Sequence, residues 1–159
     1  MSEVRNQKSD VRGQKPEVRC QRSTIGGVMQ IRSATELIVY QKAYSQAMKL
    51  FDLSKLFPPE ERYALTSQIR RSSRSVCMNM REAWAKRRYP AHFVSKLTDC
   101  DGENSETNTS MQFAVDCHYL VEPLSSELFN LNAEIGRMLG AMITNPEKFL
   151  IVAPPKSDH

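Results

Sequence analysis

Residues 58–88 would have two opposed faces as a single helix, and this pattern constrains the fold more than any other part of the sequence. At about 100° per residue, four arginines fall within about 40° of one another: Arg70, Arg74, Arg81 and Arg88. Apolar side chains recur on nearly the opposite side, at Leu65, Ile69, Val76, Met80 and Ala83. This spacing is typical of an amphipathic helix. We therefore expect a helix that packs through one face and presents cations on the other.

Length and composition favour one soluble globular domain with tails. The chain has 159 residues, of which 40% are hydrophobic and 25% are charged. No apolar run approaches the roughly 20 residues that span a bilayer, and the N-terminus lacks the apolar core of a signal peptide. We therefore expect a cytoplasmic protein with no membrane partner. Its cysteines show no close pairing and are expected to be reduced thiols: Cys20, Cys77, Cys100 and Cys117.

The N-terminus consists of three copies of one seven-residue unit, EVRNQKS, DVRGQKP and EVRCQRS, at residues 3–23. Each unit has a single apolar valine, where a coiled coil needs two apolar positions, and Gly13 and Pro16 interrupt any helix. We therefore predict a disordered basic tail over residues 1–34. Residues 1–28 hold six bases and three acids, and the rest holds 16 bases and 15 acids. This segment is either a basic nucleic-acid-binding arm or an upstream stretch that is not translated if synthesis starts at Met29.

Four helical segments follow, at about residues 35–57, 58–88, 91–120 and 124–143, and each break contains proline. In the first segment we expect the main apolar stripe at Leu37, Tyr40, Tyr44, Ala47 and Phe51, with a second flank at Val39, Ala43, Leu50 and Phe57. A helix that is apolar on two sides is either deeply buried or shared with another subunit. The last segment has the cleanest heptad-like seam, at Leu124, Leu128, Leu131, Ile135, Met138 and Met142.

The third segment is ambiguous on composition alone. An apolar stripe starts at Phe93 and Leu97 and resumes at Met111, but the intervening residues TDCDGENSETNTS read as a loop. Either the chain breaks there, or a helix carries Asn104 and Thr107 into the bundle as a polar layer.

No residue pattern in the chain indicates catalysis or metal binding. In the stretch that resembles a calcium loop and begins at Asp99, Ser110 occupies position 12, where a bidentate glutamate belongs. Cys117 and His118 are adjacent, outside any zinc-ligand spacing. Glu103 and Glu106 lack the ExxH motif of di-iron bundles, and no histidine has a recognisable nucleophile partner. We expect no enzymatic activity, no catalytic residues, no metal and no cofactor.

The second segment is the only candidate binding site. Glu82 is the only acidic residue between positions 70 and 88. The basic residues that we expect to contact nucleic acid are Arg70, Arg71, Arg74, Arg81, Lys86, Arg87 and Arg88. Arginines along one face suit phosphate contacts. One alternative is that the arginines form an ordinary solvent-exposed helix face that binds no ligand. Another is that the arginines pair with acidic groups, such as Glu103 or Glu106, across a subunit boundary.

Four blocks resemble one known family in order and content: LIVYQKAY (37–44), ERYALTSQIRRSSRSV (61–76), DGENSETNTSMQFAVDCHYL (101–120) and EIGRMLGAMITNPEKFL (134–150). Together they are similar to the bacterial four helix bundle proteins, also called the 23S rRNA intervening-sequence protein family. The resemblance spans about residues 36–150 and implies a continuous third helix. It implies an all-α, up-down-up-down antiparallel four-helix bundle over residues 35–145, with a C-terminal tail at 146–159.

The resemblance also carries expectations about partners. It implies a homo-oligomer, with a pentamer expected, and a nucleic-acid or reverse transcriptase partner, since a related accessory protein binds both. Two functions remain open: an oligomeric scaffold that binds RNA or DNA through the second helix, or a purely structural or protein-interaction bundle. In the second case the arginines form intersubunit salt bridges.

Overall fold

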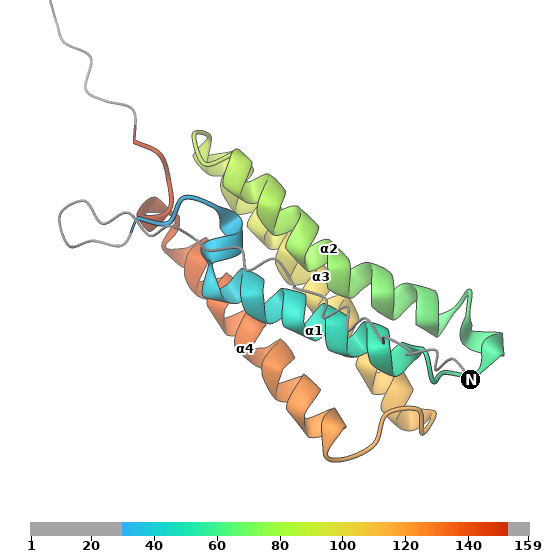
Figure 1. The fold of residues 1–159 in the computed structure, drawn as a ribbon. Coiled ribbons are helices and arrows are strands. Elements are labelled where there is room, and N and C mark those ends of the chain that lie inside the picture. The colour runs from blue at the N-terminus through green and yellow to red at the C-terminus, as the bar shows by residue number, and fades with distance from the viewer. Residues whose placement is uncertain (1–29, 153–159) are drawn as a thin grey trace, which may run out of the picture. The chain divides into compact units, whose positions relative to one another are not determined.

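The structure, a computed structural model, describes residues 30–152, and these fold into helices without any strand. The four α-helices are α1 (Ile38–Ser54), α2 (Leu65–Ala85), α3 (Pro90–Asp116) and α4 (Leu124–Thr144) (Figure 1). Three 3-10 turns flank them, η1 (Ala34–Glu36), η2 (Pro59–Glu61) and η3 (Pro146–Lys148). The prediction of an all-α fold is confirmed. Residues 1–29, the bulk of the predicted disordered tail, lie outside the described residues.

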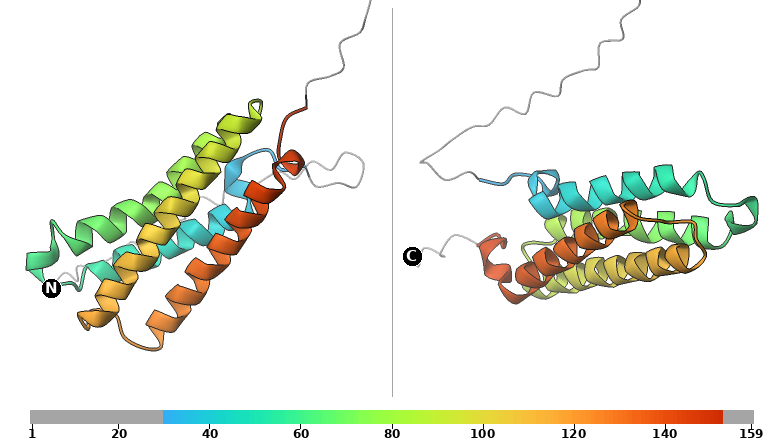
Figure 2. Two further views of the ribbon diagram at one scale, coloured as in Figure 1. Left: turned by 180° about the vertical axis from the view of Figure 1, so that it is seen from behind. Right: turned by 90° about the horizontal axis from the view of Figure 1, so that it is seen from below.

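Consecutive helices run antiparallel, so the bundle is up-down-up-down, as predicted (Figures 1 and 2). α2 packs against α1 and α3, and α4 closes the bundle by packing against the same two helices. Short connections favour this arrangement, because neighbouring helices joined by a few residues must reverse direction. No helix of the described part is long and apolar enough to cross a membrane.

The helix boundaries differ from the predictions by several residues, most of all at the start of α2. Leu37 is extended (φ −67°, ψ 130°), so α1 begins at Ile38 instead of residue 35. Ala64 (φ −116°, ψ −110°) separates η2 from α2, so the predicted helix over residues 58–88 starts only at Leu65. At its other end, α2 stops at Ala85. The predicted break at Tyr89-Pro90 is confirmed, since Tyr89 is extended (φ −121°, ψ 94°), as proline requires of the preceding residue.

Because α2 ends early, the row of arginines along it is shorter than predicted. The helix stops at Ala85, so Lys86, Arg87 and Arg88 lie in the turn that leads to α3. Arg88 is therefore not in helical register with Arg81, and the row on the helix itself ends at Arg81.

The predicted main stripe on α1 is confirmed only in part: Leu37 and Ala47 are buried, but its three aromatic residues are not. The flank predicted as secondary supplies core side chains, including Val39, Ala43 and Leu50. Of the predicted main stripe, Tyr44 is 54% exposed, and Tyr40 and Phe51 are half-buried. Both flanks are apolar, so their hydropathy could not decide which one faces α2, α3 and α4.

The core consists of two apolar clusters with buried polar side chains between them. One cluster includes Val76, Met80, Phe93, Leu97 and Leu139, and the other includes Leu50, Ile69, Met111 and Leu128. Six buried polar residues from the middle of all four helices form what we call the polar layer: Gln46, Ser72, Ser73, Asn104, Thr107 and Asn132. The predicted polar layer on a continuous α3 is confirmed, since Asn104 and Thr107 are 4% and 0% exposed.

Hydrogen bonds across the bundle satisfy the polar layer. Asn132 Nδ2 donates to Asn104 Oδ1 at 2.9 Å, and Asn104 Nδ2 donates to the Asn132 carbonyl at 3.1 Å. The Ser72 and Thr107 hydroxyl oxygens lie 3.0 Å apart. Gln46 Nε2 donates to the Leu128 carbonyl at 3.3 Å. Buried polar groups cost little only when paired in this way, which is why a loop-like composition can form the middle of α3.

Candidate nucleic-acid interface

Three of the predicted arginines gather on the side of α2 that adjoins α1. The Arg70 guanidinium lies 4.9 Å from the centroid of the Phe51 ring, and the Arg74 guanidinium lies 5.5 Å from the same centroid. Arg70 Nε also donates to Ser54 Oγ at 2.7 Å. The Phe51 ring therefore orients two cations without cancelling their charge, since a cation–π contact is an attraction to a neutral ring.

Arg81 lies farther along the same side of α2 and lines, together with Arg74, a groove between α1 and α2. We call this the α1/α2 groove. Its volume is about 330 Å³, and its other walls include Tyr40, Tyr44 and Met78. Burial raises the pKa of the Tyr40 hydroxyl, and Arg81 is close enough to oppose that rise. No carboxylate is among the residues that line the α1/α2 groove.

The remaining predicted bases lie elsewhere. Arg71 faces α3, where its Nη2 is 3.8 Å from Glu106 Oε1. Lys86 forms an ion pair with Glu82 at 2.9 Å. Arg87 stacks on Trp84 at 3.6 Å, and burial lowers the pKa of its guanidinium. Arg88 is exposed in the turn after α2. The structure thus brings together Arg70, Arg74 and Arg81 and separates the other four bases from them.

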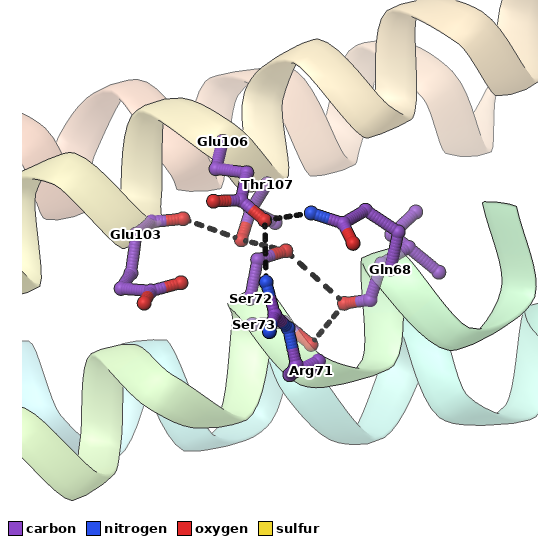
Figure 3. A network of polar contacts seen from close by, with 8 residues as sticks. Gln68, Arg71, Ser72, Ser73, Glu103, Glu106 and Thr107 are labelled. Atoms are coloured by element: carbon purple, nitrogen blue, oxygen red, sulfur yellow. Dashed lines mark hydrogen bonds and ion pairs between the residues drawn. The ribbon is translucent and has the colours of Figure 1, made fainter. Parts of the chain in front are cut away.

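Glu103 and Glu106 belong to α3 and lie along its contact with α2 (Figure 3), away from the side of α2 that carries Arg70, Arg74 and Arg81. Glu106 accepts a hydrogen bond from Gln68 and pairs weakly with Arg71. This contact is within one chain, whereas the sequence had left open a pairing across subunits. Glu103 is half-buried, and its pKa is raised by burial first and by the Glu106 charge next. Its Oε2 atom is buried without a hydrogen-bond partner among the described residues.

The two buried thiols, Cys77 and Cys100, are poor candidates for nucleophiles. Burial raises the pKa of Cys77 to about 11 and that of Cys100 to about 12, so both are protonated at neutral pH. Within residues 30–152, no group of three or more histidine, cysteine or acidic side chains is placed to hold a metal ion.

The partners of the arginines are not predicted by the sequence. Its periodicity places Tyr40, Tyr44 and Phe51 on the main packing stripe of the first helix, yet they face the arginine side of α2. One signal was available, because α1 has apolar residues on two flanks and only one of them can face the core. Which flank remained outside depended on how α1 is rotated against its neighbours.

Comparisons with known proteins agree with this fold. The sequence pattern of the family described as 23S rRNA-intervening sequence protein matches residues 35–141. Among solved structures, the chain is similar to a protein of unknown function from the S23 ribosomal protein family of Bacteroides thetaiotaomicron, with 26% identity and a TM-score of 0.61. That match covers 67% of this chain and 96% of the other. No curated protein sequence matches the chain. Because the family pattern extends over most of the four-helix bundle, the chain belongs to the 23S rRNA-intervening sequence protein family.

Proposed function

We propose that this protein is a non-enzymatic, self-associating helical bundle that binds RNA or DNA through Arg70, Arg74 and Arg81. The observation that carries the proposal is the charge of these three side chains. They lie on one side of α2 against aromatic rings of α1, and none forms an ion pair within the described residues. Such a row offers phosphate groups a cationic surface whose charge is not already neutralised.

Self-association would strengthen such binding. One row of three arginines makes few phosphate contacts, but a ring of copies, such as the pentamer that we expect, presents several rows to one polyanion. Linked sites then bind more tightly than a single site, because the later contacts are intramolecular. The other bases of the predicted set, Arg71, Lys86, Arg87 and Arg88, would contribute mainly to the general positive potential.

The test is fluorescence anisotropy with the full chain and labelled 20-nucleotide RNA and DNA, between 25 and 200 mM salt. We expect salt-sensitive binding in which Arg74→Ala and Arg81→Ala each weaken affinity and flatten the salt slope by about 0.7–0.9. Arg137→Ala on α4 is the matched control, because it removes an equal charge from an exposed position elsewhere and should change affinity far less. Absence of binding at 25 mM salt, or equal affinity of the Arg74→Ala/Arg81→Ala double variant, would overturn the proposal.

A second candidate function is a purely structural or protein-interaction bundle. It is favoured by the exposed apolar side chains beside the arginines, since Met78 is 69% and Met48 is 44% exposed. Contiguous exposed apolar surface often marks a protein interface. Here Arg74→Ala and Arg81→Ala would reduce the mass measured by multi-angle light scattering, and nucleic acid would not bind. The two measurements together distinguish the functions.

A further inference from the structure

The α1/α2 groove combines two features that a simple phosphate-binding surface does not need. The first is an aromatic stack: the Tyr40 and Tyr44 rings are nearly parallel, at an interplanar angle of 20° with centroids 6.3 Å apart. Tyr40 is half-buried against the core, whereas Tyr44 is 54% exposed. The outer ring therefore stacks on a partly buried ring, and Tyr44 presents an aromatic surface to solvent.

The second feature is the position of the cations relative to that surface. Arg74 and Arg81 line the same groove as Tyr40 and Tyr44. They are two helical turns apart on α2, or about 10 Å along its axis, and Arg70 extends the row by one more turn. With no carboxylate in the lining, the groove pairs a row of positive charge with an apolar floor.

We infer that the α1/α2 groove binds single-stranded nucleic acid, with a base stacked on Tyr44 and the adjoining phosphates on Arg74 and Arg81. This inference rests on the proposed function and specifies its ligand. In a duplex the faces of the bases are covered by neighbouring bases, so an exposed tyrosine could not stack on them. A single strand presents both a polyanionic backbone and free base faces, which is the combination that aromatic and basic grooves recognise.

Complementarity in charge and shape supports this occupant. The arginine side chains can form ionic contacts with phosphates, and the Tyr44 ring can stack on the flat face of a base. Met78 and Met48 flank the ring with flexible apolar side chains, which adapt to bases of different size. We therefore expect little preference among sequences and a clear preference for strands that carry bases.

The inference is tested by comparing three labelled ligands of 20 units with the full chain: oligo(dT), an abasic strand of equal charge, and a duplex. We expect oligo(dT) to bind about 5- to 100-fold more tightly than the abasic strand, because each stacked base adds affinity. Tyr44→Leu should remove that difference and leave the salt slope unchanged, whereas Tyr44→Phe should retain it. Arg74→Ala should flatten the salt slope and keep the preference for bases.

Tyr63→Leu is the matched control, since Tyr63 is 87% exposed and lies outside the groove; it should bind like the unmodified chain. Equal affinity for oligo(dT) and the abasic strand, or tighter binding of the duplex, would overturn the inference and leave the proposed function standing. Failure to bind any of the three ligands would overturn both. A drop in assembly mass with Tyr44→Leu, without any base-dependent binding, would show that a second copy of the chain occupies the groove instead.

Discussion

The Glu103 carboxyl lies against α2 with one oxygen, Oε2, shielded from solvent and without a hydrogen bond among the described residues. Burial is the main cause of its raised pKa, Glu106 adds to the rise, and Arg71 opposes it. The folded state therefore favours the protonated form of Glu103 more than the unfolded state does. The stability that Glu103 contributes is present below its unfolded-state pKa of about 4.3 and is lost as the pH rises through the higher folded-state pKa.

Glu103→Gln should consequently raise the free energy of unfolding at pH 7, by roughly 1 kcal/mol, because the variant has no charge to desolvate. At pH 3.5, where the carboxyl of the unmodified chain is protonated, the two proteins should be equally stable. Urea unfolding at both pH values measures the difference. Glu147→Gln, at an exposed position in η3, is the control and should change neither value. A loss of stability at pH 7 would mean that the Glu103 charge is stabilising.

At the scale of elements, α4 contains two internal glycines whose surroundings differ. A Cβ atom at Gly136 would lie 3.3 Å from Asn104 Nδ2, while a Cβ at Gly140 would have nothing within 4 Å. Asn104 cannot move freely, since its amide is bonded to the Asn132 carbonyl. An alanine at position 136 would therefore have to displace the Asn104 side chain by a few tenths of an ångström, whereas packing places no such constraint on position 140.

Gly140→Ala should therefore stabilise the protein by about 0.5–1 kcal/mol, the usual gain in helix propensity. In Gly136→Ala the same gain should be offset by displacement of Asn104, so that its free energy of unfolding falls below that of Gly140→Ala by about 1 kcal/mol or more. Thermal and urea unfolding of this matched pair give the comparison. Equal stabilisation by the two substitutions would mean that α3 and α4 are not held as closely as the structure describes.

Across the whole molecule, the polar layer divides the core into two apolar clusters. Its hydrogen bonds join α2 to α3, α3 to α4 and α1 to α4. A shift of one helix along its axis would break the bonds that it makes in this layer, at a cost of about 1–3 kcal/mol for each buried polar group left unpaired. We therefore regard the layer as the feature that sets the register of the four helices, in the way that single polar positions set the register of coiled coils.

A double-mutant cycle at Ser72 and Thr107 tests this view. Thr107→Val and Ser72→Ala each remove the hydroxyl–hydroxyl bond between α2 and α3 and should cost about 1 kcal/mol. The cost is modest because each remaining hydroxyl keeps a carbonyl of its own helix, Glu103 for Thr107 and Ile69 for Ser72. The double variant should cost less than the sum, with a coupling energy of about 1 kcal/mol, because both partners are then gone. Thr98→Val, at an exposed site on the same helix, should have little effect. Strict additivity at Ser72 and Thr107 would show that they are not coupled across the bundle.

Much of the fold could be predicted from local patterns. The apolar periodicity and the proline breaks placed four helices, because burial of an apolar stripe and the exclusion of proline from helix interiors are local constraints. The periodicity could not place the ends of α2, since the break at Ala64 leaves no residue-type signal. Nor could it settle α3, whose middle residues become helical only because α2 and α4 satisfy their polar side chains.

For the candidate site, the sequence by itself determined that Arg70, Arg74 and Arg81 share one side of a helix whose other side is buried. That follows from 3.6 residues per turn and needs no partner. Only the tertiary structure decided what faces the row. The rotation of α1 about its axis depends on how side chains from three other helices fill the core, and this packing left Tyr44 outside and turned Val39, Ala43 and Leu50 inward. The arginines therefore border an aromatic groove, which no property of the second helix alone could have revealed.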